Sequence, residues 1–414
     1  MARFILPLLI LFLPTYQIRW LIVGIPVTLL EVAIILSVLV CLLQTSGTVV
    51  YRLRYFFTDE YAPLRYAMAL FVAGATVAAV LSPNTIAAAG IWKAYVIEPI
   101  LVFYVVLWTI HTKAFSWKWL TNSFSLLLIV MGSGSILQWF HFLPIPSALW
   151  EARETFRATS IFPYPNAVAL LVGPILPIVA SAVVSSAWSK RSIVPLIGFL
   201  LGIIALYLSA STAGMIATLI GMLILLLLSS SGLARGSTNK ALGFALLSII
   251  TAIVILLPNK PLENKLQFQT HSGILRQQQY AETYQLLRDH PLMAGGLANY
   301  QQAIEPYHNT KKSGEPLLYP HNFMLALWSE FGLLGLIAMI WILAIIGVTL
   351  YRDHRRYPSM ITASLIAAWV ILVAHGVVDI PYFKNDLSVV FWILIALSIT
   401  ITPGILPANA KEAP

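Results

Sequence analysis

Residues 327–351 form the apolar run LWSEFGLLGLIAMIWILAIIGVTLY, whose one charged side chain is Glu330. A helix rises about 1.5 Å per residue, so a run of this length exceeds the ~30 Å hydrocarbon core of a bilayer. Similar apolar runs lie near 4–20, 24–44, 64–82, 86–110, 117–139, 165–187, 192–208, 211–229, 241–257, 359–379 and 387–406. The sequence therefore predicts an all-α polytopic membrane protein with about twelve transmembrane helices.

The composition supports this class. Of 414 residues, 59% are apolar and 10% are charged, whereas soluble domains have roughly 45–50% apolar and about 25% charged residues. The net charge of +9 does not indicate a nucleic-acid partner, because Lys and Arg also accumulate in the cytoplasmic loops of membrane proteins. The single cysteine, Cys41, lies inside an apolar run, so no intramolecular disulfide and no cysteine metal site is expected.

The distribution of basic residues predicts the orientation. With a cytoplasmic N-terminus, the basic residues facing the cytoplasm are Arg3, Arg52, Arg54, Arg65, Lys113, Lys118, Lys190, Arg191, Arg235, Lys240, Arg352, Arg355, Arg356 and Lys411. Those on or near the outer side in short loops are Arg19, Lys93, Arg153, Arg157 and Lys384. By the positive-inside rule both termini are cytoplasmic.

This orientation divides the chain into three parts. Residues 1–257 hold the first nine helices, residues 258–320 form a large extracytoplasmic loop with short helices, and residues 321–414 hold the last three helices. A second outer stretch spans 141–166. The polar chemistry of the outer side is concentrated in these two loops.

Residues 274–288 of the long loop have helical periodicity. One face of this helix carries Arg276, Tyr280, Thr283 and Leu287, and the opposite face carries Gln277, Ala281, Gln285 and Arg288. Arg276 is thus on the side that packs on protein, where an unpaired guanidinium is costly. Its partner is either a loop carboxylate, such as Glu282 or Glu305, or the anion of a bound ligand. The pattern leaves both interpretations open.

His321 lies at the start of the tenth predicted span, after Tyr319 and Pro320. The dipole at a helix N-terminus disfavours the imidazolium, so a neutral histidine able to accept a proton is expected there. This suits a general base, although a capping or interface role is the ordinary alternative for a lone histidine. Glu330 is not expected to orient it, since nine residues of helix span about 13 Å.

Other ionisable residues fall inside or near the ends of apolar runs, where charge is expensive. For Glu31 and Glu98 we expect structural pairing between spans. His375 and Asp379 are four residues apart and can pair on one helix face, while Lys93 lies close enough to the outer interface to contact a phosphate. Asp-x-Asp, His-Glu-x-x-His and nucleotide-binding loops are all missing from the sequence, so a metal-free site without a cofactor is expected.

Several motifs resemble those of one family. They are Pro320-His321-Asn322-Phe323 followed by Glu330-Phe331-Gly332-Leu333-Leu334-Gly335-Leu336, Arg276 to Tyr284 with the turn 290–300, Arg157 with Phe162-Pro163-Tyr164-Pro165-Asn166, and the loop Asp379 to Asp386. Together with the layout of spans and one long loop, they resemble the O-antigen ligase and polymerase superfamily. That superfamily also contains bacterial protein O-oligosaccharyltransferases.

The resemblance implies a GT-C-like glycosyltransferase of the bacterial inner membrane that builds lipopolysaccharide or another cell-envelope polysaccharide. It would move a glycan from undecaprenyl diphosphate to a hydroxyl of a glycan, lipid or protein on the outer face, with inversion and without metal or cofactor. His321 would be the catalytic base, and Arg276 and Arg157, with Lys93, would hold the diphosphate. Candidates for support or acceptor contact are Tyr280, Asp379 and Lys384.

One stretch departs from the family pattern. Many members carry an arginine at the outer start of the eighth span, where this chain has Thr212 or Ala213. If the cation is needed, Lys93, Arg153 or Lys384 must supply it.

Two other functions remain open at this stage. A repeat-unit polymerase would use the same donor, and a lipid-linked sugar transporter or flippase would also have many spans. A transporter would be expected to carry ionisable residues along a central path, whereas here they gather on the outer side.

Overall fold

The computed structural model describes residues 2–22, 25–45, 58–152, 155–185, 193–233, 271–308 and 319–400. Six helices in these ranges are long and apolar enough, by length and composition, to cross a membrane, and five shorter apolar helices accompany them. The predicted all-α membrane class agrees with this content. The predicted ninth span at 241–257, and residues 258–270 and 309–318 of the predicted long loop, lie outside the described residues.

The first two predicted spans are wrong in their boundaries. Helix α1 (Ile5–Phe12) continues only as a 3-10 turn, Leu13–Gln17, and the chain then forms an antiparallel hairpin of β1 (Arg19–Ile22) and β2 (Ile25–Thr28) before α2 (Leu29–Leu43). Pro14 and Pro26 each remove a backbone donor that a continuous helix needs. The Thr28 hydroxyl then caps α2 by accepting the N–H of Glu31 at 3.1 Å.

The remaining apolar runs within the described ranges are helices, as predicted. They are α4 (Ala62–Val80), α5 (Thr85–Trp92), α6 (Glu98–His111), α7 (Trp117–Trp139), α9 (Pro165–Ser185), α10 (Ile193–Leu208), α11 (Thr212–Leu233), α17 (Phe323–Arg356), α18 (Met360–Gly376) and α19 (Asn385–Thr400). A π-helical segment, Lys93–Ile97, joins α5 to α6. Outside the long helices lie α8 (Ala148–Glu151), α14 (His271–Asp289) and α15 (Tyr300–Ile304).

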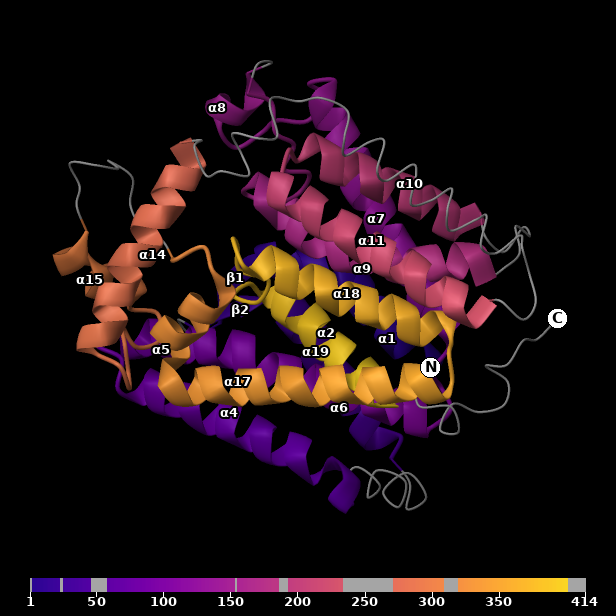
Figure 1. Cartoon of the computed structure of the whole chain (residues 1–414), viewed down its shortest axis with the longest axis horizontal. Coiled ribbons are helices and arrows are strands. Elements are labelled where there is room, and N and C mark those ends of the chain that lie inside the picture. Colours follow the sequence, from indigo (N-terminus) through magenta and orange to yellow (C-terminus); the bar gives the residue numbers. More distant parts are fainter. Residues whose placement is uncertain are drawn as a thin grey trace.

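The core surrounds α19, every residue of which is buried. It packs on α6, while α18 lies across α9 and α11, α17 runs along α4, and α10 runs along α7 (Figure 1). The α7 and α10 backbones approach closely at Gly132, where a Cβ atom would lie 2.4 Å from the carbonyl oxygen of Leu201. Small residues permit such close packing between membrane helices.

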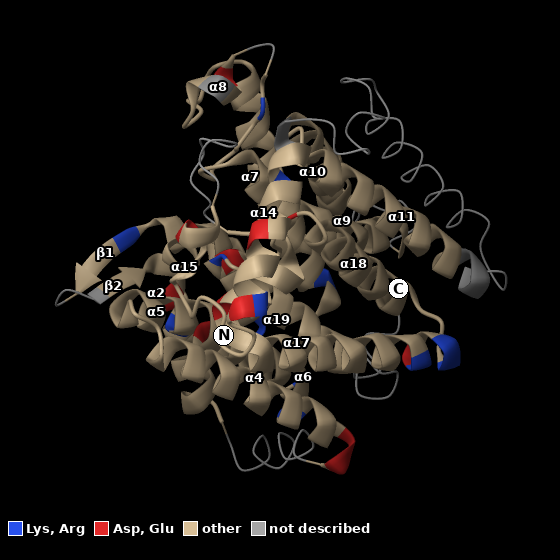
Figure 2. Cartoon of the chain, turned by 60° about the vertical axis from the view of Figure 1, so that its left-hand side comes forward, with Lys and Arg blue, Asp and Glu red and all other residues tan. Residues whose placement is uncertain are grey.

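The long apolar helices carry few charged residues along their lengths. Helices α9, α11 and α18 contain no Lys, Arg, Asp or Glu along their lengths, and the charges of α17 lie near its ends (Figure 2). Helices α14 and α15 stand at one end of the bundle, and the N-terminus lies at the other (Figure 1).

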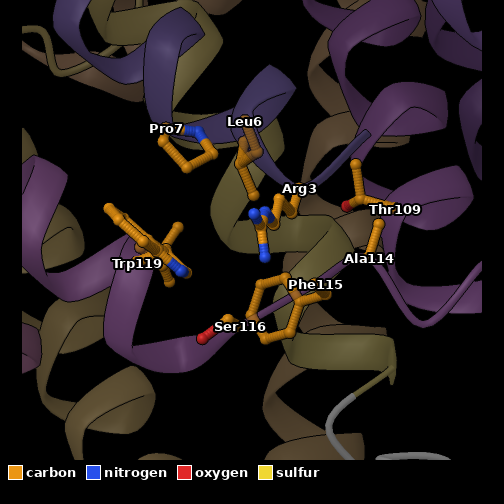
Figure 3. A pocket seen from close by; sticks show the side chains of 9 residues that line it. Arg3, Leu6, Pro7, Thr109, Ala114, Phe115, Ser116 and Trp119 are labelled. Atoms are coloured by element: carbon orange, nitrogen blue, oxygen red, sulfur yellow. The ribbon is translucent and has the colours of Figure 1, made fainter. Parts of the chain in front are cut away.

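A small pocket near the N-terminus lies between α1 and the beginning of α7. It is lined by Arg3, Leu6, Pro7, Thr109, Ala114, Phe115, Ser116, Trp119 and Leu120 (Figure 3). Because it is at the end of the bundle away from α14, it does not belong to the cluster of polar residues described next.

Candidate active site

Segments far apart in the sequence meet at the α14 end of the bundle. They are the connection before α9, helix α14, the start of α17 and the connection between α18 and α19 (Figure 1). Their side chains bring together Arg157, Arg276, Tyr280, His321 and Asp379. All five were candidates from the sequence, but their mutual contacts could not be derived from it.

The predicted helix in the long loop is confirmed by α14, and so is its polarity. Thr283 and Leu287 are buried, whereas Gln277, Ala281, Gln285 and Arg288 on the opposite face are exposed. Arg276 therefore lies on the protein-facing side. Its Nε donates to the carbonyl oxygen of Val378 at 3.0 Å, and among the described residues no carboxylate pairs with it.

Neither carboxylate proposed as a structural partner takes this role. Glu282 contacts Gln278 and His308, at 2.7 and 3.0 Å, and Glu305 is exposed. Within the described residues, the structure thus gives Arg276 a neutral backbone partner and no carboxylate partner. This arrangement is suited to an anion that comes from outside the chain.

His321 immediately precedes the N-cap of α17. The Asn322 side chain caps the helix by accepting the N–H of Leu325 at 3.0 Å, so Asn322 and not His321 has the capping role. His321 itself has φ of 44°, in the left-handed region that non-glycine residues seldom occupy. Such backbone strain is concentrated at functional sites.

A carboxylate lies beside the His321 ring. Nδ1 of His321 is 3.7 Å from Oδ1 of Asp379, which is an ion-pair distance for a protonated ring but too long for a hydrogen bond. Tyr319 covers the ring, with centroids 4.8 Å apart. The carboxylate beside the His321 ring is therefore that of Asp379, while Glu330 accepts the backbone N–H of Ala298 at 2.7 Å.

Asp379 is held by further hydrogen bonds. Its Oδ2 accepts from the Asn166 amide at 2.7 Å and its Oδ1 from the N–H of Ile380 at 2.9 Å. Burial raises the pKa of Asp379, but His321, His375 and the Ile380 N–H together lower that pKa to about 2. The carboxylate is consequently ionised throughout the pH range in which an enzyme would work.

The side-chain amide of Asn166 also connects Asp379 to Arg157. Oδ1 of Asn166 accepts from a terminal nitrogen of Arg157 at 2.6 Å, and Nε of Arg157 donates to the carbonyl oxygen of Ser209 at 3.0 Å. Burial, together with the positive charge of Arg276, lowers the pKa of Arg157 to about 10, so the Arg157 guanidinium is charged at neutral pH. A bound anion would reduce the electrostatic repulsion between these two cations.

Tyr280 connects α14 to this cluster by hydrogen bonds. Its hydroxyl lies 2.9 Å from the carbonyl oxygen of His321 and 3.0 Å from that of Val377. Burial raises the pKa of Tyr280 to about 12, which keeps the phenol protonated and able to donate. The predicted supporting residue thus contacts the backbone of the candidate base.

His375 and Asp379 do not form the local side-chain pair that their spacing suggested. Helix α18 ends at Gly376, and it is the N–H of Asp379 that bonds to the carbonyl oxygen of His375, at 3.0 Å. Among the described residues the Nε2 atom of His375 has no hydrogen-bond partner. The chain turn after Gly376 redirects the carboxylate toward Asn166 and His321.

Lys93 is committed to a structural pair. Its Nζ lies 2.8 Å from both oxygens of Glu31 and 3.3 Å from the carbonyl oxygen of Pro26. The expected pairing of Glu31 between spans is therefore found, with Lys93 as its partner. The structure does not bring Lys93 into the cluster of Arg157 and Arg276.

Lys384 lies over aromatic rings next to a carboxylate. Its Nζ is 3.7 Å from the centroid of the Phe162 ring and 3.1 Å from Oδ2 of Asp386. Burial lowers the pKa of Lys384, and the Asp386 charge opposes that shift. Of the residues that could replace the arginine missing near Thr212, Lys93 and Lys384 thus have carboxylate partners, and Arg153 lies outside the described residues.

Replacing Lys93 tests its structural assignment. Lys93→Met should destabilise the protein by about 2 kcal/mol, because it leaves Glu31 buried without a partner. The double variant Lys93→Met/Glu31→Leu should recover most of this loss. Thermal unfolding in detergent measures both, and a double variant as unstable as the single one would contradict the pairing.

Replacing Asp379 tests the histidine–carboxylate contact. Asp379→Asn should lower turnover about 10- to 100-fold, the cost of losing a carboxylate that orients a histidine. Because the pKa of Asp379 is lowered from its ordinary 3.8 to about 2, its stabilisation is present above pH 3.8 and is lost as the pH falls toward 2. An activity assay checks the first effect and acid unfolding the second. Glu305→Gln, which changes an exposed carboxylate directly after α15, is the control and should change neither.

A cluster of two arginines, a histidine and a carboxylate at one end of a bundle of apolar helices is suited to binding an anionic substrate. The O-antigen ligase family model matches residues 197–340, and this match supports membership of the O-antigen ligase superfamily. The matched segment contains Arg276 and His321, while Arg157 and Asp379 lie outside it. No curated protein matches the chain.

The match carries a coarse function with it. It supports a superfamily of glycosyltransferase-type ligases and polymerases, a family that in general implies a lipid-linked glycan and an acceptor as partners. Asn166 connects Arg157 to Asp379. It belongs to the motif Phe162-Pro163-Tyr164-Pro165-Asn166, but the sequence alone assigns it no role. Its position directly after Pro165 at a helix start is the one feature of the sequence that indicates it.

Proposed function

We propose that the protein transfers a glycan from undecaprenyl diphosphate to an acceptor hydroxyl, with inversion and without a metal ion. The observation that carries this proposal is the placement of His321, with Asp379 at 3.7 Å, in the same cluster as two charged arginines. A base and a cationic clamp are the groups that displacement of a diphosphate by a hydroxyl requires.

The base is formed by the ring of His321. Asp379 faces Nδ1 and favours the tautomer with its proton there, which leaves Nε2 as the nitrogen that accepts a proton. In the reaction the acceptor O–H bond breaks toward Nε2, and the freed oxygen pair attacks the anomeric carbon. The resulting imidazolium is stabilised by the ionised Asp379.

The arginines act on the leaving group. As the bond between the anomeric carbon and the phosphate oxygen breaks, its electron pair stays on the diphosphate, and the negative charge there grows. Arg276 and Arg157 can engage phosphate oxygens with bidentate forks. Their contribution increases toward the transition state, which is the condition for accelerating the reaction.

The charge distribution supports an extracytoplasmic site in the bacterial inner membrane. Basic residues at the other end of the bundle include Arg352, Arg355 and Arg356 at the end of α17, and such clusters mark the cytoplasmic side. His321, at the beginning of the same helix, would then face the outer side. A lipid carrier would lie with its chain between helices and its diphosphate at the cluster.

The test is a transfer assay with the purified full-length protein in detergent. A lipid-linked glycan labelled in the sugar is mixed with candidate acceptors, and transfer of the label without added divalent metal is the expected result. Products of increasing length from donor alone would indicate the polymerase alternative. Movement of the labelled lipid across proteoliposomes with no transfer would overturn the proposal in favour of a flippase.

A further inference from the structure

Helix α17 is broken within the motif Glu330-Phe331-Gly332, which the proposed reaction does not use. Gly332 has φ of 70° and ψ of −179°, a conformation open to glycine and strained for other residues. The break comes about two turns after the helix begins at Phe323. A break without a proline in a membrane helix leaves backbone groups that need other partners.

Those partners come from residues 290–299, which follow directly after α14 and are called the docked turn below. The N–H of Leu333, which in a continuous helix would bond to Ser329, donates to the carbonyl oxygen of Leu292 at 2.9 Å. The carbonyl oxygen of Ser329 accepts from the N–H of Gly295 at 3.2 Å. The helix thus exchanges one internal hydrogen bond for two with the docked turn.

Side chains on either side of the break reinforce the contact. Oε2 of Glu330 accepts from the N–H of Ala298 at 2.7 Å, and Nε1 of Trp328 donates to the carbonyl oxygen of Pro291 at 2.7 Å. Helix α4 and the residues just after it hold the turn from its other side. The N–H of Leu297 donates to the carbonyl oxygen of Ala78 in α4 at 3.3 Å, and the Ser82 hydroxyl donates to the carbonyl oxygen of Leu297 at 2.7 Å. The docked turn is therefore fixed between α17 and α4.

The glycine is required for steric reasons as well. A Cβ atom on Gly332 would lie 2.7 Å from the carbonyl oxygen of Leu292, the atom that accepts the Leu333 hydrogen bond. Gly347, further along the same helix, has nothing within 4 Å of its Cβ position. The two glycines therefore make a matched pair for substitution.

We propose that Glu330 and Gly332 are positioning residues that set the distance between Arg276 and His321. Arg276 is on α14, which runs into the docked turn, and His321 immediately precedes α17, which receives that turn. Tyr280 joins α14 to the backbone of His321 at one point, and the docked turn joins the two helices at a second point. Two attachments fix the orientation of α14 as well as its position.

The inference rests on the proposed function only for its kinetic consequence, so the experiment has a readout independent of activity. The buried Cys41 is the single cysteine, and replacing it with Ala allows spin labels at Gln285 on α14 and Ile337 on α17, both exposed. Pulsed electron paramagnetic resonance then measures the distance distribution between the two helices. Donor KM and kcat are measured on the same variants without labels.

The expected result separates the variants into two groups. Glu330→Ala and Gly332→Ala should broaden the distribution and raise the donor KM roughly 10-fold or more, with a smaller change in kcat, because Arg276 loses its place. Glu330→Gln keeps an acceptor oxygen for Ala298 and should resemble the parent protein. Gly347→Ala should also leave both measurements unchanged.

Two outcomes would overturn the inference. An unaltered distance distribution in both Glu330→Ala and Gly332→Ala would show that the docked turn does not hold α14. A broadened distribution with an unchanged donor KM would show that the docked turn holds α14 for a reason other than placing Arg276 for the donor. If the parent protein transfers no glycan, the proposed function fails, while the distance measurement still decides whether Glu330 and Gly332 position α14.

Discussion

The His321→Ala variant is expected to lose glycan transfer by a factor of about 10² to 10⁴, the usual contribution of a positioned base. The ring is partly exposed and Asn322 keeps its capping bond to Leu325, so folding should be preserved. The loss should appear in kcat, because His321 acts on the acceptor proton in the transition state and not on the bound diphosphate. The transfer assay with a labelled lipid-linked donor measures it.

A second substitution separates chemistry from backbone strain. His321 has φ of 44°, and Asn tolerates the left-handed region better than Ala does, so His321→Asn should be as inactive as His321→Ala while being at least as stable. His141→Ala removes an exposed histidine that also has a positive φ, of 59°, and should remain active. Full activity in both His321 variants would end the assignment of this residue as the base.

Arg276→Ala and Arg157→Ala are expected to lower kcat/KM for the donor by about 10² to 10³ each, the range for removing one stabilising group from a developing negative charge. Arg276→Lys should recover only part of the loss, because an ammonium keeps the charge but not the fork. Titration of the donor in the transfer assay distinguishes these variants by their KM.

The matched control for Arg276 is Arg288, on the opposite and exposed face of α14. Arg288→Ala should leave donor use unchanged. If Arg276→Ala also left donor use unchanged but lowered the thermal unfolding temperature, its bond to Val378 would be its whole role. The candidate diphosphate site would then reduce to Arg157.

Prediction from sequence succeeded where a property depends on nearby residues. The apolar runs, the helix later found as α14, its buried and exposed faces, and His321 at the start of α17 all follow from spacing along the chain. The hairpin at 19–28 was not predicted, because a long apolar segment indicates a membrane helix more strongly than Pro14 and Pro26 indicate a break in it. Lys93 was assigned to phosphate because its partner Glu31 is distant in sequence.

The apolar content and the helical periodicity establish the membrane class, since burial in a bilayer acts on each segment separately. The contacts of the candidate site have a different origin. Asn166 and Asp379 are 213 residues apart, and Arg276 and Val378 are 102 apart, so their hydrogen bonds exist only after the helices have packed. Packing brought isolated polar residues together as a histidine beside a carboxylate and a pair of arginines, because short-range interactions act only between groups that the fold has placed close to one another.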